Sequence, residues 1–297
     1  MCTAKYECHQ SIVGYADILG MEEKIKQLNN NLIDSNKLLE QIGRIIDEAK
    51  EFLGITAENN PNKKIKFFTD NIIFSWVIRE GGEGESEILN TLKYMATYQL
   101  HFSLNNYFVR GALTNGINFI NEDFVFGPAT VESYNSEKDA INPRIILCNS
   151  IVDSLKKFSS YYSATPYHRK WILKDQDEKY FVNYLYTVVD FMNQCKEYHE
   201  GFKLLKNHKE NIEKNLCEHN NNNKIWRKYS WLARYNNYFC NNVLRNEYDR
   251  YTENLPDIGI TDISDYQHFN EFDFKKAIDD LIIGNNLLNN DFTLCDL

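Results

Sequence analysis

The chain has 297 residues, 43% hydrophobic and 25% charged, so it is long enough for one or two folded domains and too mixed in composition to be disordered. No apolar run reaches the length of a membrane helix, the N-terminus has no apolar signal core, and the seven cysteines are scattered without a CxxC pair. We therefore expect a cytoplasmic protein with reduced thiols and no membrane partner. The net charge of −9 argues against a nucleic-acid surface, because neutralising phosphates needs clustered positive charge.

Strands and helices alternate in the first part of the chain. The segment Ser11 to Leu19 is rich in β-branched and aromatic residues and predicts a buried strand that ends at Gly20. Apolar residues at helical spacing predict two helices between Met21 and Phe52. Two short apolar runs, Ile65 to Phe68 and Ile72 to Ile78, predict a hairpin. A helix is expected next, over Glu87 to Asn105.

The following segments predict a second hairpin, a helix and one more strand. The hairpin spans Tyr107 to Phe126, the helix opens at Gly127-Pro128 and runs to about Lys138, and the strand follows Pro143. This order predicts an α+β sandwich with helices on one face of the sheet. Long helices are expected over 191–215, 224–245 and about 272–287. The sequence thus predicts a catalytic domain over 1–190 and a helical extension over 191–297.

Two acidic residues lie at the ends of predicted strands. Asp17 lies near the end of the first strand and Asp70 lies at the tip of the first hairpin. An unpaired buried carboxylate is costly unless a metal or a cation balances it. If the two strands are neighbours, both carboxylates emerge at one sheet edge and can share Mg or Mn ions. Gly20 precedes a helix N-terminus, which can hold a phosphate, so together these features predict a two-metal phosphoryl-transfer site.

Each feature alone also has an ordinary structural explanation. A single Asp before a helix is more often a cap, and an Asp-Asn pair at a hairpin tip is more often only a turn. Their order along the chain favours the catalytic interpretation.

The ordered segments resemble the class III nucleotidyl cyclases over about residues 10 to 150. The matching segments are Ala16-Asp17-Ile18-Leu19-Gly20-Met21, Lys64-Ile65-Lys66-Phe67-Phe68-Thr69-Asp70, Val109-Arg110-Gly111-Ala112-Leu113-Thr114-Asn115-Gly116, the helix from Gly127 to Glu137, and Pro143-Arg144-Ile145-Ile146. The resemblance implies a ferredoxin-like cyclase homology domain with a central, mostly antiparallel sheet, followed by the helical extension. It also places Asp17, Ile18 and Asp70 around two divalent ions, Mg or Mn.

Several sequence segments are similar to those of the uridylate and cytidylate cyclases of bacterial Pycsar anti-phage systems. They are YADILGM, FTDNII, VRGALTNG, FGPATVESYNSE, NPRII and KYSWLARYNN. This resemblance implies a head-to-tail homodimer. It further implies conversion of a pyrimidine nucleoside triphosphate, UTP or CTP, into a 3′,5′-cyclic monophosphate and pyrophosphate. The product would act on a downstream cyclic-nucleotide effector.

The chain departs from the class III pattern on the helix that follows Gly127. There the family carries an Asn and, four residues on, an Arg that steady the transition state, and this chain has Val131 and Asn135. The cation must then come from Arg144, which we take as the catalytic candidate, from Arg110 or Lys138, or from the partner subunit. Arg110 and Arg144 are equally compatible with structural salt bridges.

Substrate contacts are expected from Gly20, Lys66, Arg110 and Asn135. In purine-specific relatives two positions read the base, and these hold Lys66 and Phe124 here. Lys66 can donate to a base carbonyl, whereas Phe124 can neither donate nor accept, so the purine-reading pair is incomplete. We therefore expect a pyrimidine, with uracil favoured over cytosine, and Lys66 as a solvent-facing strand residue is the alternative.

Four other functions are compatible with the sequence. The chain could be an adenylate or guanylate cyclase, an inactive cyclase-fold module for nucleotide binding or dimerisation, or another palm-type enzyme with two acids on a similar sheet. It could also be an interaction protein that uses the aromatic helix with Trp226, Tyr229, Trp231, Tyr235 and Tyr238, although such a stripe is more often core packing.

Overall fold

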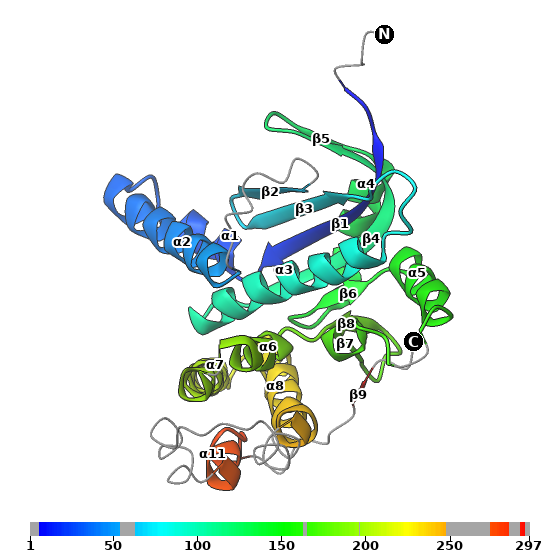
Figure 1. Cartoon of the computed structure of the whole chain (residues 1–297). Helices are drawn as coiled ribbons and strands as arrows, with labels where there is room; N and C mark the ends of the chain where they lie inside the picture. The colour runs from blue at the N-terminus through cyan, green and yellow to red at the C-terminus, as the bar shows by residue number, and fades with distance from the viewer. Residues whose placement is uncertain are drawn as a thin grey trace. The chain divides into compact units, whose positions relative to one another are not determined.

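The computed structural model describes residues 6–53, 63–162, 165–195, 197–247, 274–284 and 292–294. The chain forms two compact units, Met1–Tyr184 together with Thr293–Leu297, and Leu185–Phe292 (Figure 1). The predicted division of function, with a catalytic domain over 1–190 and an extension over 191–297, remains our proposal. No helix in the described ranges has the length and apolarity needed to cross a membrane.

Four strands form the central part of the first unit's sheet. They are β1 (His9–Ile18), β2 (Lys63–Phe68), β3 (Asn71–Val77) and β4 (Val109–Ile120), and they lie in the order β2-β3-β1-β4 with every neighbouring pair antiparallel. Helices connect β1 to β2 and β3 to β4. This βαββαβ order, with the first strand between the third and fourth, is the ferredoxin-like topology that was expected.

Further strands extend the sheet beyond β4. The short strand β6 (Ile145–Leu147) pairs with β4 in parallel, and β8 (Tyr180–Val182), β7 (Ile172–Lys174) and β9 (Thr293–Leu294) follow in antiparallel order. The strand β5 (Val125–Phe126) pairs only with the end of β4. Neither β7 nor β8 was predicted from the sequence, since three-residue strands leave too short a pattern to detect.

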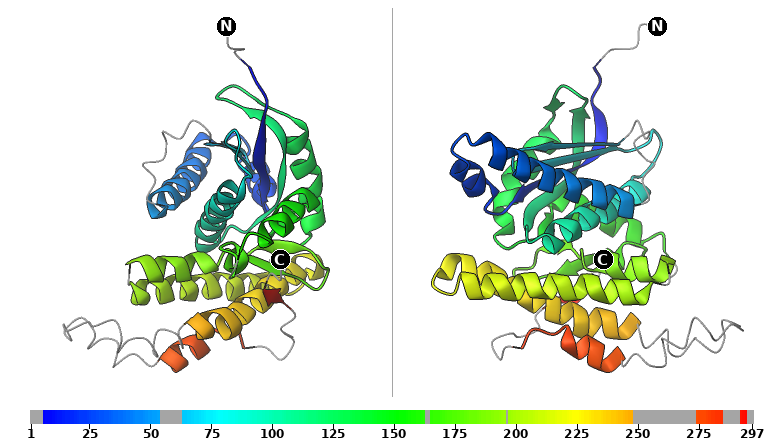
Figure 2. Two further views of the ribbon diagram at one scale, coloured as in Figure 1. Left: turned by 45° about the vertical axis from the view of Figure 1, so that its right-hand side comes forward. Right: turned by 90° about the vertical axis from the view of Figure 1, so that its left-hand side faces the viewer.

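The helices of the first unit are α1 (Met21–Gln27), α2 (Leu32–Phe52), α3 (Glu85–Leu104), α4 (Pro128–Glu137) and α5 (Asn149–Ser159), with short 3₁₀ turns η2 (Lys138–Ala140) and η3 (Arg169–Trp171). They cover both faces of the sheet, and Figure 2 (left) shows the sheet between α2 and α3 on one side and α4 on the other. The expectation of helices on one face only was therefore wrong.

The burial of β1 explains why both faces are covered. Residues 11–16 of this strand are all buried, and successive side chains of a strand point to opposite faces. On one face, a Cβ at Gly14 would contact Leu113 of β4 and Met95 of α3. On the other, Thr114 Oγ1 donates to Glu132 of α4 over 2.8 Å. Because burying an apolar side chain contributes about 1.5–3 kcal/mol, a strand buried on both sides needs a helix on each.

The second unit is helical, with α6 (Tyr186–Cys195), α7 (Tyr198–Glu218), α8 (Asn223–Tyr238), the π-helical segment η4 (Phe239–Leu244) and α11 (Phe274–Asp280). The helix expected over 191–215 thus begins earlier and breaks before α7. The helix expected over about 272–287 is described only over 274–280, and its remaining residues lie partly outside the described ranges.

The aromatic stripe of α8 is part of the second unit's core. Trp231, Tyr235 and Tyr238 are buried and each packs against Phe292, with ring centroids 5.5–6.2 Å apart. The three rings therefore offer no exposed surface for a partner, in line with the core-packing interpretation.

Buried amides of α8 hold a later segment of the chain. Asn236 Nδ2 donates to the Leu281 carbonyl oxygen over 2.9 Å, and Asn237 both donates to Ile283 O and accepts from Ile283 N. The side-chain oxygen of Asn236 contacts His208: Asn236 Oδ1 lies 3.1 Å from His208 Nδ1. His208 is fully buried, and this burial lowers its pKa from 6.5 to about 4.

We predict that the second unit loses stability in acid because of His208. A histidine whose pKa is lowered in the folded state contributes stability above its unfolded pKa of about 6.5, and that contribution is lost as the pH falls to about 4. For a shift of this size the loss approaches about 3 kcal/mol. The measurement is the free energy of unfolding in urea between pH 4 and pH 7. His208→Gln should flatten its pH dependence, and the exposed His199→Gln should not; equal slopes in all three proteins would contradict the prediction.

Candidate functional site

Asp17 and Asp70 meet at one edge of the sheet, as the sequence predicted for neighbouring strands. The β1–β3 register pairs Asp17 with Asn71, the residue after Asp70. The Ile18 backbone N–H also donates to the Asp70 carbonyl oxygen over 2.8 Å. The end of β1 is therefore tied directly to the β2–β3 turn that carries the second acid.

Hydrogen bonds from two neighbours orient the Asp70 carboxylate. Thr69 Oγ1 and Asn71 Nδ2 both donate to Asp70 Oδ1, over 2.7 and 2.6 Å. Asn71 in turn accepts from the Tyr15 hydroxyl. Burial and the charge of Asp17 raise the pKa of Tyr15 to about 12, so this hydroxyl keeps its proton at neutral pH. Both donors contact Oδ1, so neither of these two bonds uses Oδ2.

Asp17 lies beside Arg110, its cross-strand neighbour on β4. Arg110 Nη2 is 3.5 Å from Asp17 Oδ2, and Arg110 Nε forms an ion pair with Glu137 at the end of α4. The side chains of Asp17 and Arg110 are each 23% exposed, whereas Glu137 is buried. Burial raises the pKa of Glu137, and Arg110 opposes that shift. The site thus contains the acids Asp17, Asp70 and Glu137 and the arginine Arg110, and the side chains of Asp17 and Arg110 are partly exposed.

The donors of this site fit Mg or Mn ions. Within the described ranges, no three His, Cys, Asp or Glu side chains gather into a cage that would hold a metal by themselves. Mg²⁺, however, usually binds one or two carboxylates and takes its remaining ligands from substrate phosphates and water. Asp17 and Asp70 supply such a pair. The three acids also outnumber Arg110 and Lys138, whose positive charges both act on Glu137, and a divalent cation would neutralise the excess.

Ile18 and Gly20 sit at the end of β1 as expected. The Ile18 side chain is buried and its N–H is used by Asp70, so only its carbonyl oxygen is suited to a metal. Gly20 takes a left-handed conformation, with φ of 75°, before α1. That helix has only seven residues and carries Glu22 and Glu23 in its first turn, which weakens its attraction for a phosphate relative to our expectation.

Lys66 lies on the same sheet face as Tyr15, since both pair with Ile73. Its Nζ donates to the backbone carbonyl oxygen of Glu122 over 2.9 Å, so in this conformation it anchors the β4–β5 turn. Phe124 packs against Phe119, with ring centroids 5.2 Å apart, and is not a base-reading residue here. To contact a base, Lys66 would have to give up its hydrogen bond to the Glu122 carbonyl oxygen and donate to the base instead.

The two departures from the class III pattern lie on the exposed side of α4. Val131 and Asn135 are both exposed, four residues apart, and therefore share one helix face. This face is available to a substrate or to a second subunit.

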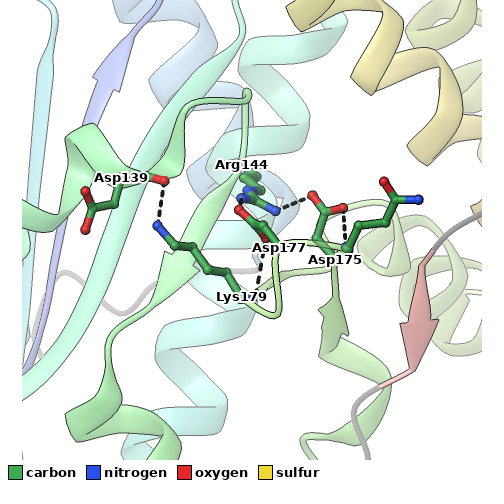
Figure 3. A network of polar contacts seen from close by, with 6 residues as sticks. Asp139, Arg144, Asp175, Asp177 and Lys179 are labelled. Carbon is green, nitrogen blue, oxygen red and sulfur yellow. Dashed lines mark hydrogen bonds and ion pairs between the residues drawn. The ribbon is translucent and has the colours of Figure 1, made fainter.

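Arg144 does not belong to this site. Its side chain is fully buried, and Figure 3 shows the guanidinium between Asp175 and Asp177 of the β7–β8 turn, with which Nη1 and Nη2 form ion pairs. In the same turn Lys179 Nζ donates to the Asp139 carbonyl oxygen over 2.9 Å. Because its terminal nitrogens are taken and no surface is exposed, Arg144 cannot reach a triphosphate at Asp17 in this conformation. We correct its expected role as catalytic cation to a structural one.

Sequence reasoning missed Tyr15, Asn71 and Glu137. The first two carried a usable signal, because Tyr15 precedes Asp17 by two residues on the same strand face and Asn71 directly follows Asp70. Glu137 gave no local signal, since its pairing with Arg110 depends on how α4 packs.

Comparisons with known proteins give only distant similarities. No family model matches the chain, and no curated protein matches it. A class III adenylyl cyclase-like ATP-binding protein from Pseudomonas aeruginosa is similar in structure, with 12% identity and a TM-score of 0.38. The similarity covers 50% of our chain and 35% of that protein. The catalytic core of a rhodopsin-guanylyl cyclase with converted specificity, in complex with ATPalphaS, is also similar in structure, with 13% identity and a TM-score of 0.38. This similarity covers 60% of our chain and 98% of that protein. We base no assignment on either similarity.

We predict that Arg144→Ala destabilises the protein by about 3–5 kcal/mol, because it leaves two acids near a buried position without their cation. Asp175→Asn should cost more than Asp177→Asn, since the two side chains are 9% and 41% exposed. The free energies of unfolding in urea test both statements. An Arg144→Ala variant as stable as the wild type would remove the structural assignment.

Proposed function

We propose that this chain is a nucleotidyl cyclase that converts a pyrimidine nucleoside triphosphate into a 3′,5′-cyclic monophosphate and pyrophosphate. The observation that carries the proposal is the meeting of Asp17 and Asp70 at one edge of a ferredoxin-like sheet, through the Ile18–Asp70 hydrogen bond and the β1–β3 register. The order of the sequence segments around these acids supports the same activity. Because these segments resemble those of Pycsar cyclases, the proposal extends to a second-messenger synthase in anti-phage defence, with a cyclic-nucleotide effector downstream.

In this function each residue of the site has a definite task. Asp17, Asp70 and the carbonyl oxygen of Ile18 would hold the divalent ions, which supply charge neutralisation at the triphosphate and activation of the attacking 3′-hydroxyl. Arg110 would contact the phosphates next to Asp17, and the first turn after Gly20 would border them. The Tyr15–Asn71 pair keeps the Asp70 carboxylate in one orientation, so that no reorganisation is needed when a cation binds.

Base choice would depend on Lys66. An ammonium group can donate to the O2 or O4 carbonyl of uracil, whereas cytosine presents an amino group at position 4. Phe124 is engaged with Phe119 and provides no polar group for a purine edge. These points favour UTP over CTP, and either pyrimidine over ATP or GTP.

The proposed enzyme works as a homodimer, and one surface is suited to the contact. Large apolar side chains are exposed on β4, the β4–β5 hairpin, α4 and the residue that follows η2: Ile117, Phe124, Phe126, Val131, Tyr134 and Ile141. Exposed large apolar side chains on consecutive elements are typical of a surface that a second subunit covers. A dimer would also supply the transition-state cation that Val131 and Asn135 cannot provide.

We predict that Asp17→Ala and Asp70→Ala each lower the turnover rate by about a thousandfold, because a lost metal ligand removes several kcal/mol of transition-state stabilisation. The assay incubates each of the four nucleoside triphosphates with Mn²⁺ and identifies products by mass spectrometry. Circular dichroism of the variants checks that they remain folded. Retention of more than about a tenth of the activity by either variant would contradict the site, and a clear preference for ATP or GTP would overturn the pyrimidine assignment.

A second prediction concerns the dimer. Phe126→Glu and Ile141→Glu, at side chains 64% and 63% exposed, should give monomers with little activity, because a charge cannot be buried in an apolar contact without cost. Leu39→Glu on α2, at a side chain 71% exposed, is the matched control and should leave the dimer intact. Light scattering measures the mass. A wild-type monomer that is fully active at nanomolar concentration would refute the dimer.

A further inference from the structure

A chain of charges links three elements at the site. Asp17 comes from β1, Arg110 from β4 and Glu137 from α4, and Arg110 lies between the two acids. The two contacts of the arginine differ. Glu137 takes Nε in an ion pair, whereas the Nη2–Asp17 separation of 3.5 Å exceeds an ordinary hydrogen bond. The closer ion pair of Arg110 is therefore with the helix, and the longer one is with the neighbouring strand.

The burial of Glu137 makes this contact costly to form. Its side chain is only 6% exposed, and loss of hydration raises the pKa of the carboxyl. Removing a carboxylate from water is unfavourable unless a cation compensates it, and Arg110 forms the ion pair with Glu137 here. Glu137 and Arg110 therefore depend on each other, although the arginine itself stays partly exposed.

The two arginines on this sheet show what the contact through Nε achieves. Arg144 gives both terminal nitrogens to Asp175 and Asp177 and faces no solvent. Arg110 places Nε against Glu137 and Nη2 next to Asp17, and its side chain stays 23% exposed. A guanidinium is planar, so fixing Nε also limits the directions in which its terminal N–H groups point.

We propose that Glu137 is a positioning residue that aims the terminal nitrogens of Arg110 at the triphosphate of a bound nucleotide. This inference rests on the proposed function and adds to it a residue that does not touch the substrate. When cations occupy Asp17, its charge is no longer available to Arg110, and the ion pair with Glu137 still holds the guanidinium in place. Phosphate oxygens then become the partners of the terminal nitrogens.

A double-mutant cycle separates positioning from general stability, since a residue that acts through Arg110 has no effect once Arg110 is gone. The proteins are the full-length wild type, Glu137→Gln, Arg110→Ala and the double variant. The probe is α,β-methylene-UTP with Mn²⁺, whose blocked bond allows an equilibrium affinity to be measured by calorimetry. Glu132→Gln is the matched control, because Glu132 lies on the same helix and accepts a hydrogen bond from Thr114 of β4.

We expect Glu137→Gln to weaken nucleotide affinity by about tenfold in the wild-type background and by less than about twofold in the Arg110→Ala background. Glu132→Gln should change it by less than about twofold. Wild-type affinity in Glu137→Gln, or the same loss in both backgrounds, would overturn the inference. If the wild type binds the probe but forms no cyclic nucleotide from any triphosphate, the proposed function fails while the cycle still decides the role of Glu137. If it binds none of the four α,β-methylene triphosphates, both fail.

Discussion

The structure depends on the complete burial of β1. Six consecutive residues of this strand are buried, so it must have a strand on each side and a helix on each face. These four neighbours are β3, β4, α3 and α4, and the candidate site lies where β1 emerges from among them. Asp17 is the first partly exposed residue after the buried run. The site therefore owes its position to the packing of the sheet: β3 and β4 contribute Asn71 and Arg110, which contact the two acids, and α4 contributes Glu137, which contacts Arg110.

Charge is handled in two different ways on the same sheet. At the β7–β8 turn, two acids surround one buried arginine and leave it no free terminal nitrogen. At the end of β1, Asp17 and Glu137 share one arginine that stays partly exposed, and Asp70 lies in the adjacent turn. The first arrangement closes a turn onto the sheet, and such pairs are lost at high cost when one partner is removed. The second has more negative charge than its protein partners neutralise, which favours binding of a cation.

The sequence predicted the elements that have strong local patterns and the acids that follow them. The β1 run, the hairpin with Asp70 and the long helix before β4 could all be recognised from a few adjacent residues. The partners of Arg144 could not, because Asp175 and Asp177 lie more than thirty residues away in the chain, in the turn between two strands of three residues each. The same limit applies to Glu137, whose role depends on the direction in which α4 packs. The unbroken apolar run of β1 did signal two covered faces, and expecting one was a misinterpretation of that pattern.

The strand β9 has a consequence for the order in which the chain folds during synthesis. It pairs with β7 in the first unit, yet it follows the whole second unit in the sequence. On the ribosome, the outer edge of β7 therefore stays open while more than a hundred residues of the second unit are still being made. An open strand edge pairs readily with other chains, so this interval is the time when the nascent protein is most exposed to aggregation. The second unit is thus an insertion into the first, and a chaperone would be needed most before β9 emerges.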